Sequence, residues 1–214
     1  MSRYIQSLIK QGEHQQLDFK HSITDSKKIA RSLAAFANTD GGTLLIGVKD
    51  NGRIAGINSD EEYYMVEAAA QMYCKPAINF EVTKWDIEGK SILEVKVKAS
   101  SKRPHKAPDT KGEYKAYIRV NDENLLASAI QVKIWKAENR KQALTLSLSE
   151  KEQALLEYLR QHSTITTNQF AKVAFIPTSE AERTLINLTV LNLISFNEVE
   201  QRFEVKEAIL DARF

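Results

Sequence analysis

The sequence contains one cysteine, Cys74, and has no long apolar run. A single cysteine excludes an intrachain disulfide and any zinc cluster built from cysteines, and it is typical of a protein of the reducing cytoplasm. No segment approaches the roughly 18 apolar residues that a membrane span needs. Residues 1–14 also lack the apolar core of a signal peptide. We therefore expect a cytoplasmic protein that does not enter the membrane.

Two further absences limit the chemistry. Gly41 and Gly42 are not followed by the Gly-Lys-Ser/Thr sequence of a phosphate-binding P-loop. The four histidines show no metal-ligand spacing, so a histidine-based zinc site is not expected. Internal repeats and low-complexity tracts are absent as well. The sequence alone thus predicts no cofactor.

The length and the charge distribution indicate two domains with different partners. A chain of 214 residues suits one medium domain, residues 1–140, and one small domain, residues 148–214. Residues 1–147 carry 23 Lys and Arg against 18 Asp and Glu, whereas residues 148–214 carry 7 against 10. Long-range attraction for a polyanion therefore belongs to the first domain.

Hydrophobic periodicity predicts an α+β fold for the first domain, a mixed β-sheet with flanking helices. Asp50-Asn51-Gly52 is a strong turn signal, and residues 100–112 contain two prolines and few apolar groups, which predicts an exposed loop. Asn38, Gly41 and Gly42 are expected to adopt positive φ between a helix and a strand. The predicted helices cover residues 2–10, 25–38, 60–73 and 125–140, and the predicted strands cover residues 16–20, 43–48, 53–57, 78–82, 93–97 and 114–120.

The second domain has the pattern of a small winged helix. A capped helix begins at Ser149, helices follow at residues 167–173 and 179–191, and residues 193–196 and 203–205 form a terminal hairpin. Three helices followed by a hairpin are a variant of the helix-turn-helix arrangement.

Residues 13–56 contain motifs of a known family. They are Glu13, Asp18-Phe19-Lys20, the Phe-Ala-Asn-Thr-Asp-Gly-Gly sequence at 36–42 and the Ile-Gly-Val-Lys-Asp sequence at 46–50. This pattern resembles the Schlafen AlbA-type domain, a DNA-binding module of microbial proteins and the core of the Schlafen RNA-cleaving proteins. Weaker similarity continues at Arg103-Pro104-His105 and at residues 117–120, so the resemblance covers residues 10–135. It implies the AlbA-like fold and nucleic acid as partner.

The same resemblance implies a candidate catalytic site. In the ribonuclease-active Schlafens, two acids five residues apart and a third after the Ile-Gly-Val strand form the catalytic triad, and they correspond here to Glu13, Asp18 and Asp50. Three such carboxylates could hold Mg²⁺ or Mn²⁺ for phosphodiester cleavage. The structural alternative is that Glu13 and Asp18 are solvated, with Asp18 paired to Lys20 or Lys49, and that Asp50 serves the turn.

A basic segment provides the candidate nucleic-acid contacts. Residues 96–119 carry eight Lys and Arg against two acids, with Tyr114 and Tyr117 interleaved. Cations on a loop can neutralise phosphates and release counterions, although the lysines could instead keep an edge strand soluble. The predicted nucleic-acid-binding residues are Lys20, Lys98, Lys102, Arg103, His105, Lys106, Lys115, Arg119 and Arg183.

The winged helix is a weaker candidate reader of bases. Its helix 179–191 offers Arg183 beside Glu180 and Glu182, and its hairpin is acidic, which favours homodimer formation or partner docking. The first hypothesis is a non-catalytic nucleic-acid-binding protein, a DNA-binding transcriptional regulator. The alternatives are a metal-dependent nuclease that uses Glu13, Asp18 and Asp50, and a protein-interaction adaptor.

Overall fold

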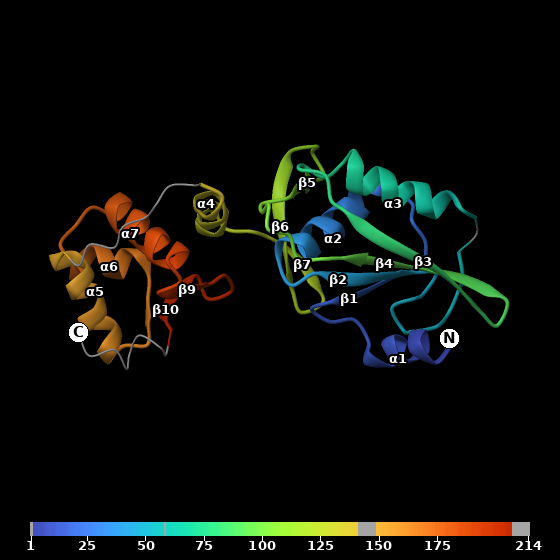
Figure 1. Ribbon diagram of the computed structural model, residues 1–214, viewed down its shortest axis with the longest axis horizontal. Coiled ribbons are helices and arrows are strands. Elements are labelled where there is room, and N and C mark those ends of the chain that lie inside the picture. The colour runs from blue at the N-terminus through green and yellow to red at the C-terminus, as the bar shows by residue number, and fades with distance from the viewer. Residues whose placement is uncertain (1, 58, 141–148, 207–214) are drawn as a thin grey trace. The chain divides into compact units, whose positions relative to one another are not determined.

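The computed structural model describes residues 2–57, 59–140 and 149–206. The chain forms two compact units, Met1–Ala127 and Ser128–Phe214 (Figure 1). Helices and strands alternate in the first unit up to α3 (Glu61–Gln71), five strands follow, and the second unit is mostly helical. The predicted α+β class, a mixed sheet with flanking helices, is confirmed.

The first unit is built on a four-stranded mixed sheet with the strand order β1-β2-β4-β3. β1 pairs in parallel with β2, and the other neighbours are antiparallel. The predicted hairpin across residues 88 and 89 is confirmed, but its strands are longer than expected. The strands are β1 (Leu17–Lys20), β2 (Gly42–Ile46), β3 (Phe80–Ile87) and β4 (Lys90–Val97).

Helices cover both faces of this sheet (Figure 1). Leu44 and Ile46 of β2 face the core beneath α2 and α3, whereas Leu45 faces the core beneath α1. This alternation follows from the two-residue period of a strand, and it explains why residues 43–48 form a continuous apolar run. The helices are α1 (Ser2–Gln11), α2 (Ser26–Asn38) and α3 (Glu61–Gln71).

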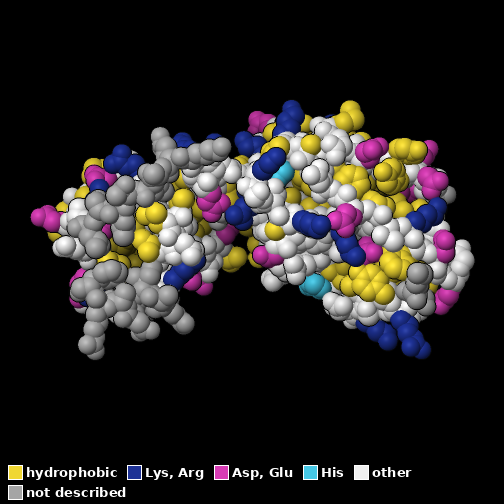
Figure 2. Space-filling view, in the orientation of Figure 1, with side chains coloured by type: hydrophobic (Ala, Val, Ile, Leu, Met, Phe, Trp, Pro, Cys, Tyr) yellow, Lys and Arg dark blue, Asp and Glu magenta, His cyan; other side chains and the backbone are white. Residues whose placement is uncertain are grey.

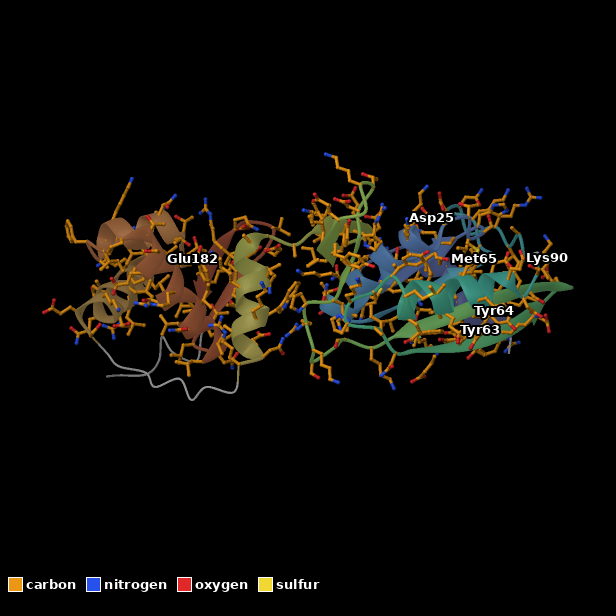
Figure 3. All side chains as sticks on the ribbon, turned by 90° about the horizontal axis from the view of Figure 1, so that it is seen from above. Asp25, Tyr63, Tyr64, Met65, Lys90 and Glu182 are labelled. Atoms are coloured by element: carbon orange, nitrogen blue, oxygen red, sulfur yellow. The ribbon has the colours of Figure 1, made fainter. Side chains whose placement is uncertain are left out.

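Helix α2 begins and ends at well-defined residues. Asp25 caps its start by accepting a hydrogen bond from the Lys27 backbone N–H (Figure 3). After its end, Gly41 has φ of +72°, and a Cβ there would lie 2.7 Å from the Val97 carbonyl oxygen. The predicted positive φ is thus confirmed at Gly41 and wrong at Asn38 and Gly42, because Asn38 still belongs to the helix and has a different function, described below.

Residues 100–127 differ most from the prediction. A second small sheet, with the order β5-β6-β7, packs against α2. Residues 100–112 are therefore not a wholly exposed loop, since Ala107 and Pro108 are buried in this sheet. The predicted strand 53–57 is reduced to one bridge between Val48 and Ile54. The strands of the second sheet are β5 (Lys106–Pro108), β6 (Tyr114–Val120) and β7 (Glu123–Leu126).

The second unit contains the predicted helices and terminal hairpin. A short strand that sequence reasoning missed, β8, joins the hairpin in a sheet of order β8-β10-β9. The core of the second unit contains Leu155, Phe170, Leu185 and Phe203. The elements are α5 (Glu150–Gln161), β8 (Thr164–Ile165), α6 (Thr167–Val173), α7 (Thr178–Val190), β9 (Ile194–Asn197) and β10 (Arg202–Val205).

Helix α4 (Ala129–Glu138) corrects the predicted domain boundary. We expected a helix at 125–140 to close the first domain, but β7 occupies residues 123–126 and α4 belongs to the second unit. The reason is its apolar face, because Ile134 is 2% exposed in the core that contains Leu155 and Leu185. Glu198 of the β9–β10 hairpin accepts hydrogen bonds from the Ser128 backbone N–H and hydroxyl at the start of α4.

In the described part of the chain, no helix combines the length and the apolar character that crossing a bilayer requires.

Candidate nucleic-acid interface

Asp18 lies in a buried ion-pair network rather than on an open surface. Its carboxylate is 2.9 Å from Lys20 Nζ and 3.4 Å from Arg119 Nη2, and the Asp18 and Arg119 side chains are 3% and 1% exposed. Arg119 also donates to the Leu17 carbonyl and to Asn124 Oδ1. The expected pairing of Asp18 with Lys20 is confirmed. The buried Asp18 carboxylate and its cationic partners therefore link β1 to β6 and serve the stability of the fold.

Arg119 was therefore wrongly predicted as a nucleic-acid contact. Its guanidinium is enclosed by Asp18, Asn124 and the Phe36 ring, whose centroid is 5.3 Å from Cζ. A phosphate could reach it only if the buried ion pair opened, which would leave Asp18 with one cation fewer. Sequence reasoning missed this because an Arg in an alternating strand gives no sign of which face it occupies.

Glu13 lies beside Asp18. Its Oε1 accepts a hydrogen bond of 2.8 Å from the Phe19 backbone N–H. Burial and the neighbouring Asp18 carboxyl together raise the pKa of Glu13 above its ordinary value, although the Phe19 N–H acts in the opposite direction. Two of the three predicted catalytic acids are thus brought together.

Asp50 does not complete this pair as a metal site. It is exposed in the turn that ends with Gly52, as the structural alternative expected. Within residues 2–57, 59–140 and 149–206, no three His, Cys, Asp or Glu side chains gather as metal ligands. The residues present do not fit Mg²⁺ or Mn²⁺, because the Asp18 carboxylate already faces two cations.

Asn38 explains much of the Phe-Ala-Asn-Thr motif. Its side chain is buried, donates to the carbonyls of His105 and Tyr117 at 2.8 Å each, and accepts a hydrogen bond of 2.7 Å from the His105 backbone N–H. The end of α2 is therefore fastened to the segment before β5 and to β6. This arrangement needs a side chain with both a donor and an acceptor, which Asn supplies.

His105 was also wrongly predicted as a nucleic-acid contact, because it is 3% exposed. Its ring nitrogens lie 2.9 Å from the Pro76 carbonyl and 2.7 Å from the Ser100 hydroxyl. The carbonyl can only accept, so Nδ1 carries the proton and Nε2 accepts from Ser100. Burial, together with the positive charge of Lys102, lowers the pKa of His105. The ring is a neutral support for the loop.

The basic segment forms one wall of a hollow of about 540 Å³, which we call the loop groove. Lys96, Lys98 and Lys102 line it with Ser100, Ser101 and Glu81. Two of these lysines have acidic neighbours, since Lys96 is 3.1 Å from Glu94 and Lys98 is 2.7 Å from Glu81. Among the described residues, Lys102 Nζ has no carboxylate within ion-pair distance.

The remaining predicted cations are dispersed. Lys115 pairs with Glu113 at 2.6 Å, and Lys106 and Arg103 are half-buried. Figure 2 shows Lys and Arg side chains interspersed with Asp and Glu over the face in view. The structure thus places Lys98 and Lys102 at one hollow, but it does not join all the predicted residues into a single basic surface.

A second hollow, of about 460 Å³, lies between α2 and the β6–β7 hairpin. We call it the helix pocket. Its lining includes Lys20, Lys28, Arg31, Tyr117, Asn124 and Leu125. Sequence reasoning identified Lys20 but missed Lys28 and Arg31. The missed signal was a helix that carries three cations and no acid, at Lys27, Lys28 and Arg31 of α2.

A family model of the Schlafen AlbA_2 domain matches residues 13–128 of the chain. The chain belongs to this family. The matched range ends within one residue of the boundary between the two units, so the Schlafen AlbA_2 domain and the first unit are nearly the same segment. Membership supports a nucleic-acid-binding role for this domain.

Solved structures are similar at low identity. The DIP2311 protein of Corynebacterium diphtheriae matches with a TM-score of 0.48 and 20% identity over 89% of this chain, which spans only 38% of that protein. The N-terminal domain of a RecG-related, ATP-dependent DNA helicase-like protein of Nitrosomonas europaea matches with a TM-score of 0.38 and 18% identity. That match covers 68% of this chain and 97% of the other.

Outside the Schlafen AlbA_2 domain, Arg183 is exposed on α7. The acids beside it are neutralised, because Glu180 pairs with Lys151 at 2.7 Å and Glu182 pairs with Lys133 at 2.5 Å. Lys133 belongs to α4, which packs along α7 (Figure 3). Ala181, Leu185 and Ile186 are all buried in the core of this unit, so little of this helix is free to enter a DNA groove.

Proposed function

We propose that the Schlafen AlbA_2 domain binds nucleic acid through the loop groove. The observation that carries the proposal is that Lys98 and Lys102 line one open hollow, next to Lys96, whose ammonium group lies 3.1 Å from the buried Glu94. These lysines come from the end of β4 and from the following loop, which Asn38 and His105 hold in place. A fixed set of cations can neutralise successive phosphates without ordering a mobile loop first.

The ion pair between Lys98 and Glu81 does not block this function. The two side chains are 86% and 64% exposed, so the pair is solvated and contributes little free energy. A phosphate that approaches Lys98 therefore replaces a weak partner. Lys102 needs no such exchange, because none of the described carboxylates lies within ion-pair distance of its ammonium group.

Charge reversal tests the proposal. We expect Lys98→Glu with Lys102→Glu to weaken binding of a fluorescent oligonucleotide at least about tenfold at about 50 mM salt, and to reduce the slope of log K against log salt by about two. Fluorescence anisotropy at several salt concentrations measures both quantities. The matched control, Arg3→Glu with Lys10→Glu, removes the same charge from exposed positions of α1. An unchanged salt slope, or an equal loss in the control, would contradict the loop groove as the interface.

The narrower proposal is that the polymer is DNA and that the protein regulates transcription. Competition between duplex DNA, single-stranded DNA and RNA of one sequence at constant salt tests the first part. Preference for RNA would overturn it. Changed transcript levels after deletion of the gene would support the second part, provided that bound DNA from the same cells maps to the affected promoters.

For the second unit we propose partner docking, including homodimer formation, rather than base reading. Helix α4 packs against α7 and leaves less of α7 free to contact bases, which supports docking over base reading. Light scattering of the full chain over a range of concentrations tests dimer formation. A monomer at all concentrations, together with loss of DNA binding on Arg183→Glu, would show that this unit reads DNA instead.

Cleavage is not proposed, since no three acidic side chains gather as metal ligands among the residues that the structure describes. The nuclease alternative stays a prediction. Incubation with labelled tRNA and single-stranded DNA in Mn²⁺ tests it, with Asp50→Ala as the control for a contaminating enzyme.

A further inference from the structure

The helix pocket concentrates positive charge that the described carboxylates do not fully balance. Lys20, Lys28 and Arg31 line it, and Glu123 is the one acid in its lining. In the described ranges, Lys28 and Arg31 make no ion pair with a carboxylate. Lys20 shares Asp18 with Arg119, so a single carboxylate faces two cations there. The pocket therefore has an unbalanced positive charge and favours a ligand with more than one negative charge.

Arg31 is held in a fixed orientation. Its Nε donates a hydrogen bond of 2.9 Å to the Pro108 carbonyl. The two Nη groups have no hydrogen-bond partner among the described residues, so they can form the paired hydrogen bonds that a guanidinium makes to phosphate. The ordering of this side chain is complete before a ligand arrives, which lowers the entropic cost of binding.

The opposite wall is also ordered, and it is less polar. Asn124 Nδ2 donates to the Ser32 hydroxyl at 2.9 Å and Asn124 Oδ1 accepts from Arg119, which fixes the wall beneath the cations. Leu125 is 41% exposed and Tyr117 lies at the pocket with 7% exposure. Burial raises the pKa of Tyr117, so its hydroxyl stays neutral at physiological pH. A ligand would meet cations on one side and Tyr117 and Asn124 on the other.

We propose that the helix pocket binds a nucleoside 5′-monophosphate, free or at the phosphorylated end of a strand. Lys28 and Arg31 hold the phosphate, and Tyr117 and Asn124, which share one face of the β6–β7 hairpin, contact the nucleoside. A phosphate monoester carries about −1.5 to −2 charges at pH 7 and presents three acceptor oxygens, whereas a phosphodiester within a strand carries one charge. The charge of the pocket matches the monoester better. A hollow of about 460 Å³ is also within the usual range for small-ligand sites.

The proposal deepens the proposed function and rests in part on it, because both involve nucleic-acid phosphates. The residues are separate, however. Lys28 and Arg31 do not line the loop groove, and Lys98 and Lys102 do not line the helix pocket. Each site can therefore fail without the other.

Calorimetric titration of the full chain with adenosine 5′-monophosphate, adenosine and inorganic phosphate tests the ligand class. We expect the monophosphate to bind at least about tenfold more tightly than either fragment, since each fragment lacks one set of contacts. Equal affinity for adenosine would overturn the role of the cations. Equal affinity for inorganic phosphate would overturn the nucleoside contact.

Variants test the assigned residues. We expect Lys28→Gln, which alters an exposed side chain, and Arg31→Gln each to lower the affinity for adenosine 5′-monophosphate at least about fivefold. Lys10→Gln alters an exposed lysine of α1 that lines neither hollow, so it is the matched control and should leave this affinity unchanged. Circular dichroism confirms that each variant is folded. Unchanged affinity in folded Lys28→Gln and Arg31→Gln proteins would overturn the site.

Oligonucleotides distinguish the two sources of the ligand and separate the two proposals. A strand of about ten nucleotides with a 5′-phosphate should bind more tightly than the same strand with a 5′-hydroxyl if strand ends enter the pocket. The preference should then disappear in Arg31→Gln and persist in Lys98→Glu with Lys102→Glu. Binding of the monophosphate alone, without this preference, assigns the pocket to free nucleotides. Loss of hydroxyl-strand binding only in the loop-groove variant would uphold the proposed function whatever the helix pocket does.

Discussion

Single side chains decide which cations of the first unit face outward. Arg119 and Lys98 are both basic residues at or beside a strand of this unit, yet Arg119 is enclosed with Asp18 and Lys98 is 86% exposed. The difference comes from the partner, because a buried carboxylate in β1 can hold an arginine in the interior while an exposed glutamate cannot. The buried cation therefore stabilises the fold, whereas the exposed cation is accessible for the phosphate contact that we propose.

His105 gives a pH-dependent prediction at this scale. Because burial lowers its pKa in the folded protein, the unfolded chain takes up the proton first as the pH falls. The resulting stability is fully present above the unfolded pKa of about 6.5 and is lost as the pH falls through the lower folded value. We expect the urea midpoint to decrease between about pH 6.5 and pH 5, and His105→Gln to flatten this decrease. An exposed control, His21→Gln, should retain it; an identical pH profile in His105→Gln would contradict the role of the ring.

The sequence identified the acidic pair and the lysines of the loop groove, but not the buried state of Arg119 and His105. Motif spacing shows that Glu13 and Asp18 lie close together, since five residues span a turn and a short strand. It does not show that Asn38 binds the His105 backbone, because this contact joins residues 67 positions apart. Long-range hydrogen bonds of this kind decide exposure, and periodicity carries no information about them.

At the scale of elements, apolar periodicity predicted the helices and strands of the central sheet and missed three short strands, β5, β7 and β8. β2 and α2 are continuous, strongly patterned segments, and both were found within two residues of their bounds. β5, β7 and β8 are two to four residues long and exist because neighbouring strands pair with them. Such elements depend on tertiary context rather than on local propensity.

The packing of helix α4 against the second unit leads to a prediction about stability. Ile134 is 2% exposed and packs in the core of the second unit, so Ile134→Ala should destabilise that unit by about 2–5 kcal/mol. Hydrogen exchange, measured peptide by peptide, should show faster exchange in α5 and α7. Lys136→Ala alters an exposed residue of the same helix and serves as the control. Unaltered exchange in α7 after Ile134→Ala would mean that α4 contributes nothing to its stability.

At the scale of the whole molecule, the chain divides before Ser128 rather than within the predicted linker. The predicted boundary followed a helix that was expected to close the first domain at residue 140, whereas the physical boundary follows the packing of helix α4 in the second unit. A helix with an apolar face joins whichever core accepts it. The sequence of α4 shows that such a face exists but not which core receives it.

Fragments test this division. We expect residues 128–214 to fold cooperatively and residues 148–214 to be unstable, because the shorter fragment lacks Ile134 and the partly buried Ile130 and Ala137. Thermal unfolding followed by circular dichroism compares the two. Residues 1–127 should retain the fold of the first unit, since its two sheets and three helices are complete within that range. Equal melting temperatures for the two C-terminal fragments would place the boundary after α4.

Helix α2 forms part of both hollows, with Ala37 at the loop groove and Lys28 and Arg31 at the helix pocket. Ala34, Ala35 and Ala37 in the same helix are at most 1% exposed and leave no room for a larger side chain. A substitution that tilts this shared wall would alter both binding activities at once. In a random-mutagenesis screen, substitutions of buried α2 residues should therefore weaken binding at both hollows. Substitutions of exposed residues that line one hollow should weaken binding at that hollow alone.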